Sequence, residues 1–75
     1  MNNVVLHHRF ETATQPLKQG KSIRAHIDYS KDKLGLNEND YQITTEYGEV
    51  VNKDKVLNEN KNYIFYLFSK SPSKA

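Results

Sequence analysis

The chain has 75 residues, no cysteine, and 11 basic against 9 acidic residues. A chain of this length forms one domain with a modest core, which leaves no room for a deep substrate cavity. Without cysteine it has neither disulfides nor thiolate zinc sites, and no apolar run reaches the roughly 18 residues of a membrane span. The N-terminus also lacks the pattern of a signal peptide. We therefore expect one domain at residues 1–69, in the cytoplasm and without a membrane partner.

The near-neutral charge argues against a nucleic-acid partner. The net charge is +2, and only Arg9 and Arg24 among the basic residues are arginines. Nucleic-acid binders carry a dense basic face, and Arg reads phosphates and guanine better than Lys does. We therefore expect no nucleic-acid partner. The many Lys and Asn residues are typical of an AT-rich genome and favour a bacterial or phage source.

The N-terminal quarter predicts two strands. Val4–Phe10 alternates, with its even-numbered side chains on one face and its odd-numbered side chains on the other. Glu11–Thr14 is expected to form a turn, and Gln15–Gln19 a second, short strand. Pro16 cannot donate a hydrogen bond to a strand ladder, so the second strand is expected at a sheet edge.

The stretch Ser22–Leu36 has the pattern of one complete helix, over about residues 23–34. The Ser22 hydroxyl is a good N-cap because it accepts a bond from a free backbone N–H of the first turn. Gly35 can adopt the left-handed conformation that ends a helix. Ile23 and Ile27 lie one turn apart and predict the buried side of the helix.

The middle of the chain predicts a hairpin. Tyr41–Glu46 alternates, Gly48 supplies the positive φ that a tight turn needs, and Val50–Val51 begins a short return strand. Val56 and Leu57 form a small apolar pair, which we expect to cover an edge of the sheet.

The last apolar segment predicts a central strand. Tyr63–Phe68 (YIFYLF) is a run of aromatic and apolar residues, which is typical of a strand covered on both faces. The polar residues 70–75 after it, which include Pro72, are expected to be disordered.

This order of strands around one helix resembles the ubiquitin-like β-grasp family. The resemblance rests on the Ser22-Ile23 helix start with its Gly35 stop, the strand and turn of Tyr41–Gly48, and the final strand Tyr63–Phe68. It implies an α+β fold with a four- or five-stranded mixed sheet and one helix packed across it. The first hairpin departs from the family because it lacks a Thr-Gly turn. No glycine follows Gly48, so the terminal Gly-Gly of ubiquitin-type modifiers and sulfur carriers is also missing.

The resemblance implies protein binding through the sheet face that the helix does not cover. On the last strand, Tyr63, Phe65 and Leu67 point one way and Ile64, Tyr66 and Phe68 the other. Tyrosine suits such a surface because it joins a large apolar body to a polar tip. We expect a protein-binding surface of these residues: Ile64, Tyr66 and Phe68 with Val5 and His7 of the first strand. Two alternatives stay open, namely that loops and lysine stems cover this face within the monomer, or that a second copy does so in a homodimer.

The sequence contains no convincing constellation for catalysis or metal binding. His7, His8 and His26 are its histidines, and adjacent strand residues point to opposite faces, so His7 and His8 cannot share a site. His8 and His26 could converge between helix and sheet, but zinc needs three or four ligands. No nucleophile elbow and no glycine-rich phosphate loop is present. We therefore predict no catalytic residue, no metal, no cofactor and no enzyme activity.

These observations predict a non-catalytic, ubiquitin-like protein-binding module. A first alternative is a ubiquitin-like modifier or carrier, attached through its C-terminus in a bacterial conjugation-type system. A second is a small phage- or plasmid-encoded inhibitor of a host protein. The edge strands could also accept a strand from another chain, but Pro16 and the nearby lysines disfavour this pairing.

Overall fold

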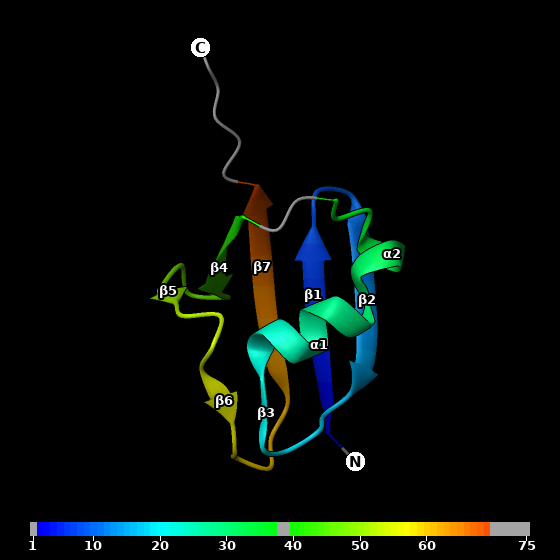
Figure 1. The fold of residues 1–75 in the computed structure, drawn as a ribbon. Coiled ribbons are helices and arrows are strands. Elements are labelled where there is room, and N and C mark those ends of the chain that lie inside the picture. Colours follow the sequence, from blue (N-terminus) through cyan, green and yellow to red (C-terminus); the bar gives the residue numbers. More distant parts are fainter. Residues whose placement is uncertain (1, 38–39, 70–75) are drawn as a thin grey trace.

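A mixed sheet forms the body of the molecule in the computed structural model, which describes residues 2–37 and 40–69 (Figure 1). Its five strands lie in the order β2-β1-β7-β4-β5. Their bounds are β1 Asn3–His8, β2 Glu11–Pro16, β4 Tyr41–Thr45, β5 Val50–Val51 and β7 Tyr63–Ser69. The central strands β1 and β7 are parallel, and every other neighbouring pair is antiparallel. The predicted α+β class with a mixed sheet is therefore confirmed.

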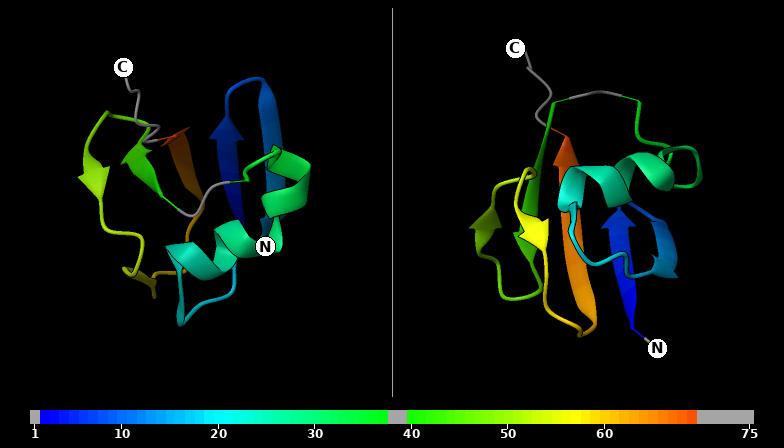
Figure 2. Two further views of the ribbon diagram at one scale, coloured as in Figure 1. Left: turned by 45° about the horizontal axis from the view of Figure 1, so that its top comes forward. Right: turned by 60° about the horizontal axis from the view of Figure 1, so that its bottom comes forward.

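The remaining elements lie on one side of this sheet. The helical segments are α1 (Ile23–Tyr29) and α2 (Lys31–Leu34), and a second, two-stranded sheet pairs β3 (Lys21–Ser22) with β6 (Val56–Leu57). The views in Figures 1 and 2 agree that both helical segments cover the same face of the five-stranded sheet. In the described part of the chain, no helix is long and apolar enough to cross a membrane.

The core fills the space between the helices and the sheet. Alternate residues of the strands point into it, so that Val4, Leu6, Phe65 and Leu67 are each less than 5% exposed. The other members of the core are Ala13, Ile23, Ile27, Leu34, Leu36, Tyr41, Ile43 and Leu57. The predicted buried side of the helix, with Ile23 and Ile27, is confirmed.

The start of α1 is held by backbone and side-chain acceptors. The Ser22 hydroxyl accepts a hydrogen bond of 3.1 Å from Ala25 N, as predicted for an N-cap. The N–H groups of Ile23 and Arg24 donate to the carbonyls of Lys55 and Lys53, at 2.9 and 2.8 Å. The segment before β6 therefore satisfies the donors at the helix start, and Val56–Leu57 pairs with β3 instead of covering an edge of the main sheet.

The predicted continuous helix over residues 23–34 is divided at Ser30, which corrects the sequence prediction. The Ser30 N–H donates to Ile27 O at 3.0 Å, three residues back, rather than to His26 O. The His26 carbonyl instead accepts a 2.6 Å bond from Gln15 Nε2, which also donates to the Ser30 hydroxyl at 2.9 Å. A buried side chain from β2 thus takes the place of one helix hydrogen bond.

The second helical segment, α2, ends at Gly35, as predicted. Gly35 has φ +64°, and Gly35 N and Leu36 N donate to the carbonyls of Asp32 and Lys31 at 3.2 and 3.1 Å. These two bonds form a Schellman motif, in which the residue after the glycine turns back onto the helix. Leu36 is buried there, next to the end of the helix.

The first hairpin differs from its prediction. β1 ends at His8, and Glu11 already pairs with His8 in β2, so Glu11–Thr14 is strand and not turn. The turn consists of Arg9, which has φ +58°, and Phe10, whose side chain is fully exposed instead of sharing a face with His8. The second strand therefore covers Glu11–Pro16 rather than residues 15–19. It lies at the sheet edge as predicted, where a proline is tolerated.

The last strand is central, as predicted, but it is not covered on both faces. Phe65 and Leu67 lie in the core, whereas Tyr66 and Phe68 are 37% and 54% exposed. Gly48 has φ +85° in the predicted turn, and Val50–Val51 forms the predicted return strand. The predicted disordered tail at residues 70–75 lies outside the described residues.

We predict that Gln15→Met lowers the free energy of unfolding by roughly 1–3 kcal/mol, because it leaves a buried carbonyl and a buried hydroxyl without their donor. Methionine retains most of the buried volume, so the change isolates the two hydrogen bonds. The measurement is urea denaturation followed by circular dichroism. Thr14→Val on the exposed side of the same strand is the control and should change stability by less than about 0.5 kcal/mol. Equal losses in both variants would contradict the assignment.

Candidate functional site

One face of the five-stranded sheet is left uncovered by the helices. Because strand side chains alternate, every residue next to a core position in β1, β2, β4 and β7 points to this face. The register of the strand pairs places one further residue, Val50, on the same side. We call this surface the open face; its residues are Asn3, Val5, His7, Thr12, Thr14, Pro16, Gln42, Thr44, Val50, Ile64, Tyr66 and Phe68.

The residues predicted for protein binding lie together in the middle of the open face. Val5 is paired with Ile64, and His7 with Tyr66, in the parallel ladder of β1 and β7. Val5, His7 and Ile64 are half-buried, while Tyr66 and Phe68 are exposed. The structure therefore brings all five side chains onto one continuous surface of two adjacent strands.

A row of side chains crosses the open face at Tyr66. The Tyr66 ring stacks on the His7 ring, with centroids 4.8 Å apart and an angle of 17° between the planes. His7 Nδ1 lies 3.0 Å from the Thr12 hydroxyl, and Thr44 is paired with Tyr66 on the other side. Among the described residues no hydrogen bond engages the Tyr66 hydroxyl, so this polar tip is available to a partner.

The open face carries no Asp, Glu, Lys or Arg at any of its positions, although 27% of the chain is charged. Charged residues stand in the turns that follow two of its strands: Arg9 after β1, and Glu46 after β4. Large exposed aromatic residues on an uncharged surface are the pattern of an interaction site rather than of a solvated sheet.

A hollow of about 520 Å³ lies where β1 and β7 end. Its lining combines three residues of the open face with Arg9 of the turn after β1 and with three further residues at the ends of β1 and β7. In chain order the lining is His7, His8, Arg9, Tyr66, Leu67, Phe68 and Ser69. Arg9 is not among the residues predicted for this surface. No sequence signal marks it, because the residue turns the chain in a left-handed conformation that is usually left to glycine or asparagine.

The two buried histidines have separate structural partners. His8 Nδ1 lies 2.9 Å from Leu34 O, and His26 Nδ1 lies 2.9 Å from Ser22 O. A carbonyl only accepts, so Nδ1 carries the proton in both rings. His26 Nε2 then accepts from Lys18 N at 3.1 Å. The expectation that His8 and His26 could converge is therefore wrong, and the described residues include no group of three or more His, Cys, Asp or Glu that could hold a metal ion.

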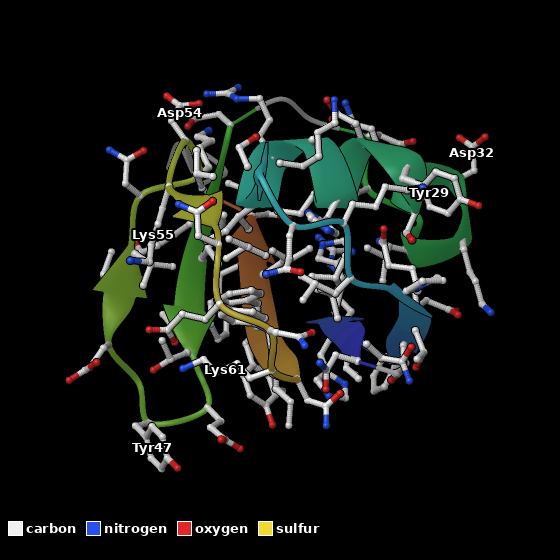
Figure 3. The ribbon with its side chains drawn as sticks, turned by 90° about the horizontal axis from the view of Figure 1, so that it is seen from below. Tyr29, Asp32, Tyr47, Asp54, Lys55 and Lys61 are labelled. Carbon is white, nitrogen blue, oxygen red and sulfur yellow. The ribbon has the colours of Figure 1, made fainter. Side chains whose placement is uncertain are left out.

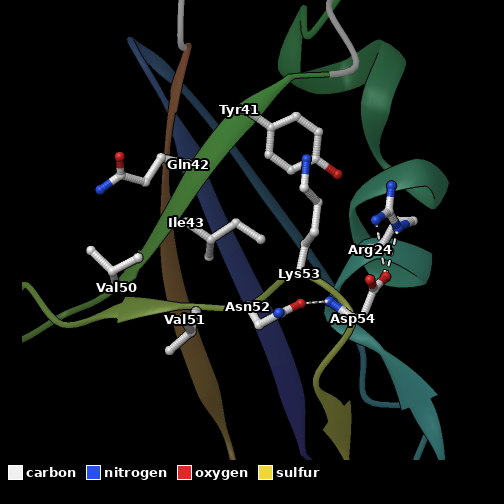
Figure 4. Close-up of a pocket in the computed structure, with 9 residues that line it drawn as sticks. All are labelled: Arg24, Tyr41, Gln42, Ile43, Val50, Val51, Asn52, Lys53 and Asp54. Atoms are coloured by element: carbon white, nitrogen blue, oxygen red, sulfur yellow. Dashed lines mark hydrogen bonds and ion pairs between the residues drawn. The ribbon is translucent and has the colours of Figure 1, made fainter.

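A second hollow, of about 510 Å³, lies between α1, β4 and the segment before β6 (Figure 4). Arg24 Nη2 forms an ion pair of 3.0 Å with Asp54 Oδ1. Lys53 Nζ lies 4.4 Å from the centroid of the Tyr41 ring, within the range of a cation–π contact. The charges in this hollow thus engage neighbouring protein groups, which favours a structural role for them.

Comparison with known proteins assigns the chain to no family. No family model matches it, and no curated protein matches it. The functional interpretation therefore rests on the geometry and chemistry of the open face.

Burial raises the pKa of the Tyr41 phenol above its usual value of 10.0, and the charge of Asp28 acts in the same direction. In the unfolded chain the phenol ionises near pH 10. Its pKa is higher in the folded protein, so ionisation of the phenol destabilises the folded state relative to the unfolded state. We predict that this contribution is complete below about pH 10 and is lost as the pH rises through the pKa of the folded protein.

Urea denaturation of the wild type and of Tyr41→Phe at about pH 8 and at about pH 11 measures this effect. The wild type should lose more stability between the two pH values than the variant, which has no ionisable phenol at position 41. The same loss in both proteins would show that Tyr41 does not cause the pH dependence.

Proposed function

We propose that the protein is a non-catalytic binding module of the ubiquitin-like β-grasp class, which contacts another protein through its open face. The observation that carries this proposal is a sheet face without charged residues whose centre exposes Tyr66 and Phe68. The strand order β2-β1-β7-β4-β5, with a parallel central pair and α1 crossing one face, is compatible with a β-grasp.

A protein partner fits this surface better than a small molecule does. Small-molecule sites are concave and enclose most of their ligand, whereas the open face extends across the strands of the sheet. Interface centres are enriched in aromatic residues and depleted of charges. Tyr66 and Phe68 are central and partly exposed, so they are the candidates for the few residues that carry most of the binding energy.

The His7–Tyr66 stack adds an argument for preorganisation. The ring of Tyr66 is held at 4.8 Å from His7, and His7 is in turn within hydrogen-bond distance of Thr12. A side chain that is already positioned loses less rotamer freedom when a partner binds. The row across the sheet therefore presents the Tyr66 hydroxyl at a defined place.

We predict that Tyr66→Ala and Phe68→Ala each weaken the binding of a partner by more than about 1 kcal/mol, or about fivefold in Kd. The tagged protein is first used to capture partners from native host lysate, and the Kd of a purified partner is then measured by calorimetry. Circular dichroism of each variant establishes that it is folded.

Tyr29→Ala is the matched control, because Tyr29 is 71% exposed and projects from the helix side of the molecule (Figure 3). It should leave the Kd unchanged. Equal effects of Tyr29→Ala and Tyr66→Ala would place the interface elsewhere, and unfolding of both open-face variants would show that their side chains belong to the core. Adducts that survive denaturing conditions would favour a covalent modifier instead.

A further inference from the structure

We propose that the protein partner of the open face presents an Asp or Glu side chain to Arg9, in the hollow where β1 and β7 end, beside an apolar side chain that covers Tyr66 and Phe68. This inference rests on the proposed function, because it uses the same face and names the chemistry of its partner. It is carried by an arginine that lines a hollow of about 520 Å³ and has no ion pair among the described residues.

The hollow contains one formally charged side chain, and that side chain is a cation. Arg9 is the only Lys, Arg, Asp or Glu among the described residues that line it. The other lining residues are histidine, tyrosine, phenylalanine, leucine and serine. A guanidinium group matches a carboxylate in shape, because its planar fork donates two parallel hydrogen bonds to the two carboxylate oxygens. The complementary group for this hollow is therefore a carboxylate.

The chain does not supply this carboxylate itself. Within residues 2–37 and 40–69, no ion pair and no hydrogen bond involves the side chain of Arg9, which is exposed. The nearest acidic residue along the chain is Glu11, at the start of β2. It shares the helix side of the sheet with Ala13 and Gln15, because strand side chains alternate. The guanidinium group of Arg9 thus stays available to a partner.

The backbone at Arg9 gives a second reason to assign the residue a role. Its φ of +58° lies in the left-handed region, which residues with a side chain rarely adopt. Glycine adopts this conformation without strain, and asparagine adopts it more readily than arginine does. The turn alone therefore does not call for an arginine. Backbone positions of this kind cluster where a side chain has a function, which agrees with a guanidinium group held beside the open face.

The aromatic part of the lining calls for an apolar group next to the carboxylate. Tyr66 is stacked on His7, and both Tyr66 and Phe68 are exposed at the hollow. A carboxylate alone would leave these rings in water, whereas an adjacent aliphatic or aromatic side chain covers them. Exposed side chains supply nearly all the carboxylates on the surface of a folded protein, so the carboxylate is assigned to Asp or Glu and not to a chain end.

Selection from a phage-displayed library of random dodecapeptides tests the proposal, because displayed peptides offer only side-chain carboxylates. The immobilised wild type should enrich peptides with Asp or Glu next to an aromatic or aliphatic residue. Arg9→Glu should instead enrich Lys or Arg at that place, because like charges repel and opposite charges attract. Lys33→Glu is the matched control, since Lys33 is an exposed cation on α2. It should enrich the same peptides as the wild type.

Calorimetry with one selected peptide, acetylated and amidated at its ends, then measures the contact. Arg9→Gln, and replacement of the acidic residue of the peptide by its amide, should each weaken binding by about fivefold. The two changes together should weaken it no more than either one alone, because both remove the same interaction. Lys33→Gln should leave the Kd unchanged. Circular dichroism of each variant establishes that it is folded.

A wild type that enriches no acidic peptides, or an Arg9→Glu variant that still enriches them, would overturn the proposal. Additive losses in the calorimetric cycle would show that the carboxylate meets a group other than Arg9. Recovery of binding by the amide peptide when its C-terminus is left free would overturn the assignment to a side chain. If Tyr66→Ala abolishes peptide binding while Arg9→Gln has no effect, this inference fails and the proposed function stands. If neither variant has an effect, both fail.

Discussion

The parallel pairing of β1 with β7 is the constraint on which the rest of the structure depends. Two parallel neighbours cannot be joined by a tight turn, so the chain between them must cross the sheet on one of its faces. That crossing contains α1 and α2, and both lie on the same side. The core therefore forms on that side, where Leu6 of β1 and Phe65 of β7 are in register and buried. Within residues 2–37 and 40–69, no element covers the opposite side of the same two strands, and the open face is the result.

The helical crossing is fixed to the sheet by polar contacts as well as by apolar packing. Gln15 reaches from β2 to the junction of the two helical segments, and the ring of His8 donates from β1 to the last carbonyl of α2. Backbone carbonyls at helix ends lack partners within the helix, and burying them without a donor is costly. These side chains supply the donors, so the crossing segment has one position on the sheet. A single position of the helices in turn fixes which residues of β7 are buried and which are exposed.

The elements that local residues determine could be predicted from the sequence. Ser22, Gly35 and Gly48 each act on the backbone within a few residues, and each has the predicted conformation. The break at Ser30 could not be predicted, because it depends on a hydrogen bond from Gln15, far away in the sequence. The first turn has no glycine, and four of the six residues of the strand after it are Glu, Thr or Gln, so its pattern resembled a loop.

Only part of the candidate surface could be predicted from the sequence. A run of aromatic and apolar residues such as Tyr63–Phe68 has no period, so it does not reveal which side meets the helix. Alternation along the strand predicts only that Ile64, Tyr66 and Phe68 share one face. The lack of charge across the whole open face appears only when the register of all five strands is known. The same is true of Arg9, whose place in the hollow beside Tyr66 and Phe68 depends on a turn that the sequence does not mark.

The pairing of β1 with β7 also has a consequence for how the chain folds. Val4 is in register with Tyr63, so residues 9–62 lie between two strands that must meet at the centre of the sheet. Closing so long a loop costs entropy before any contact is gained, and folds dominated by such non-local pairs form slowly. During synthesis the middle of the sheet is missing until β7 has left the ribosome. Both the core and the surface with Tyr66 must therefore form late and together, so that a nascent chain exposes its apolar strands until the last one is added.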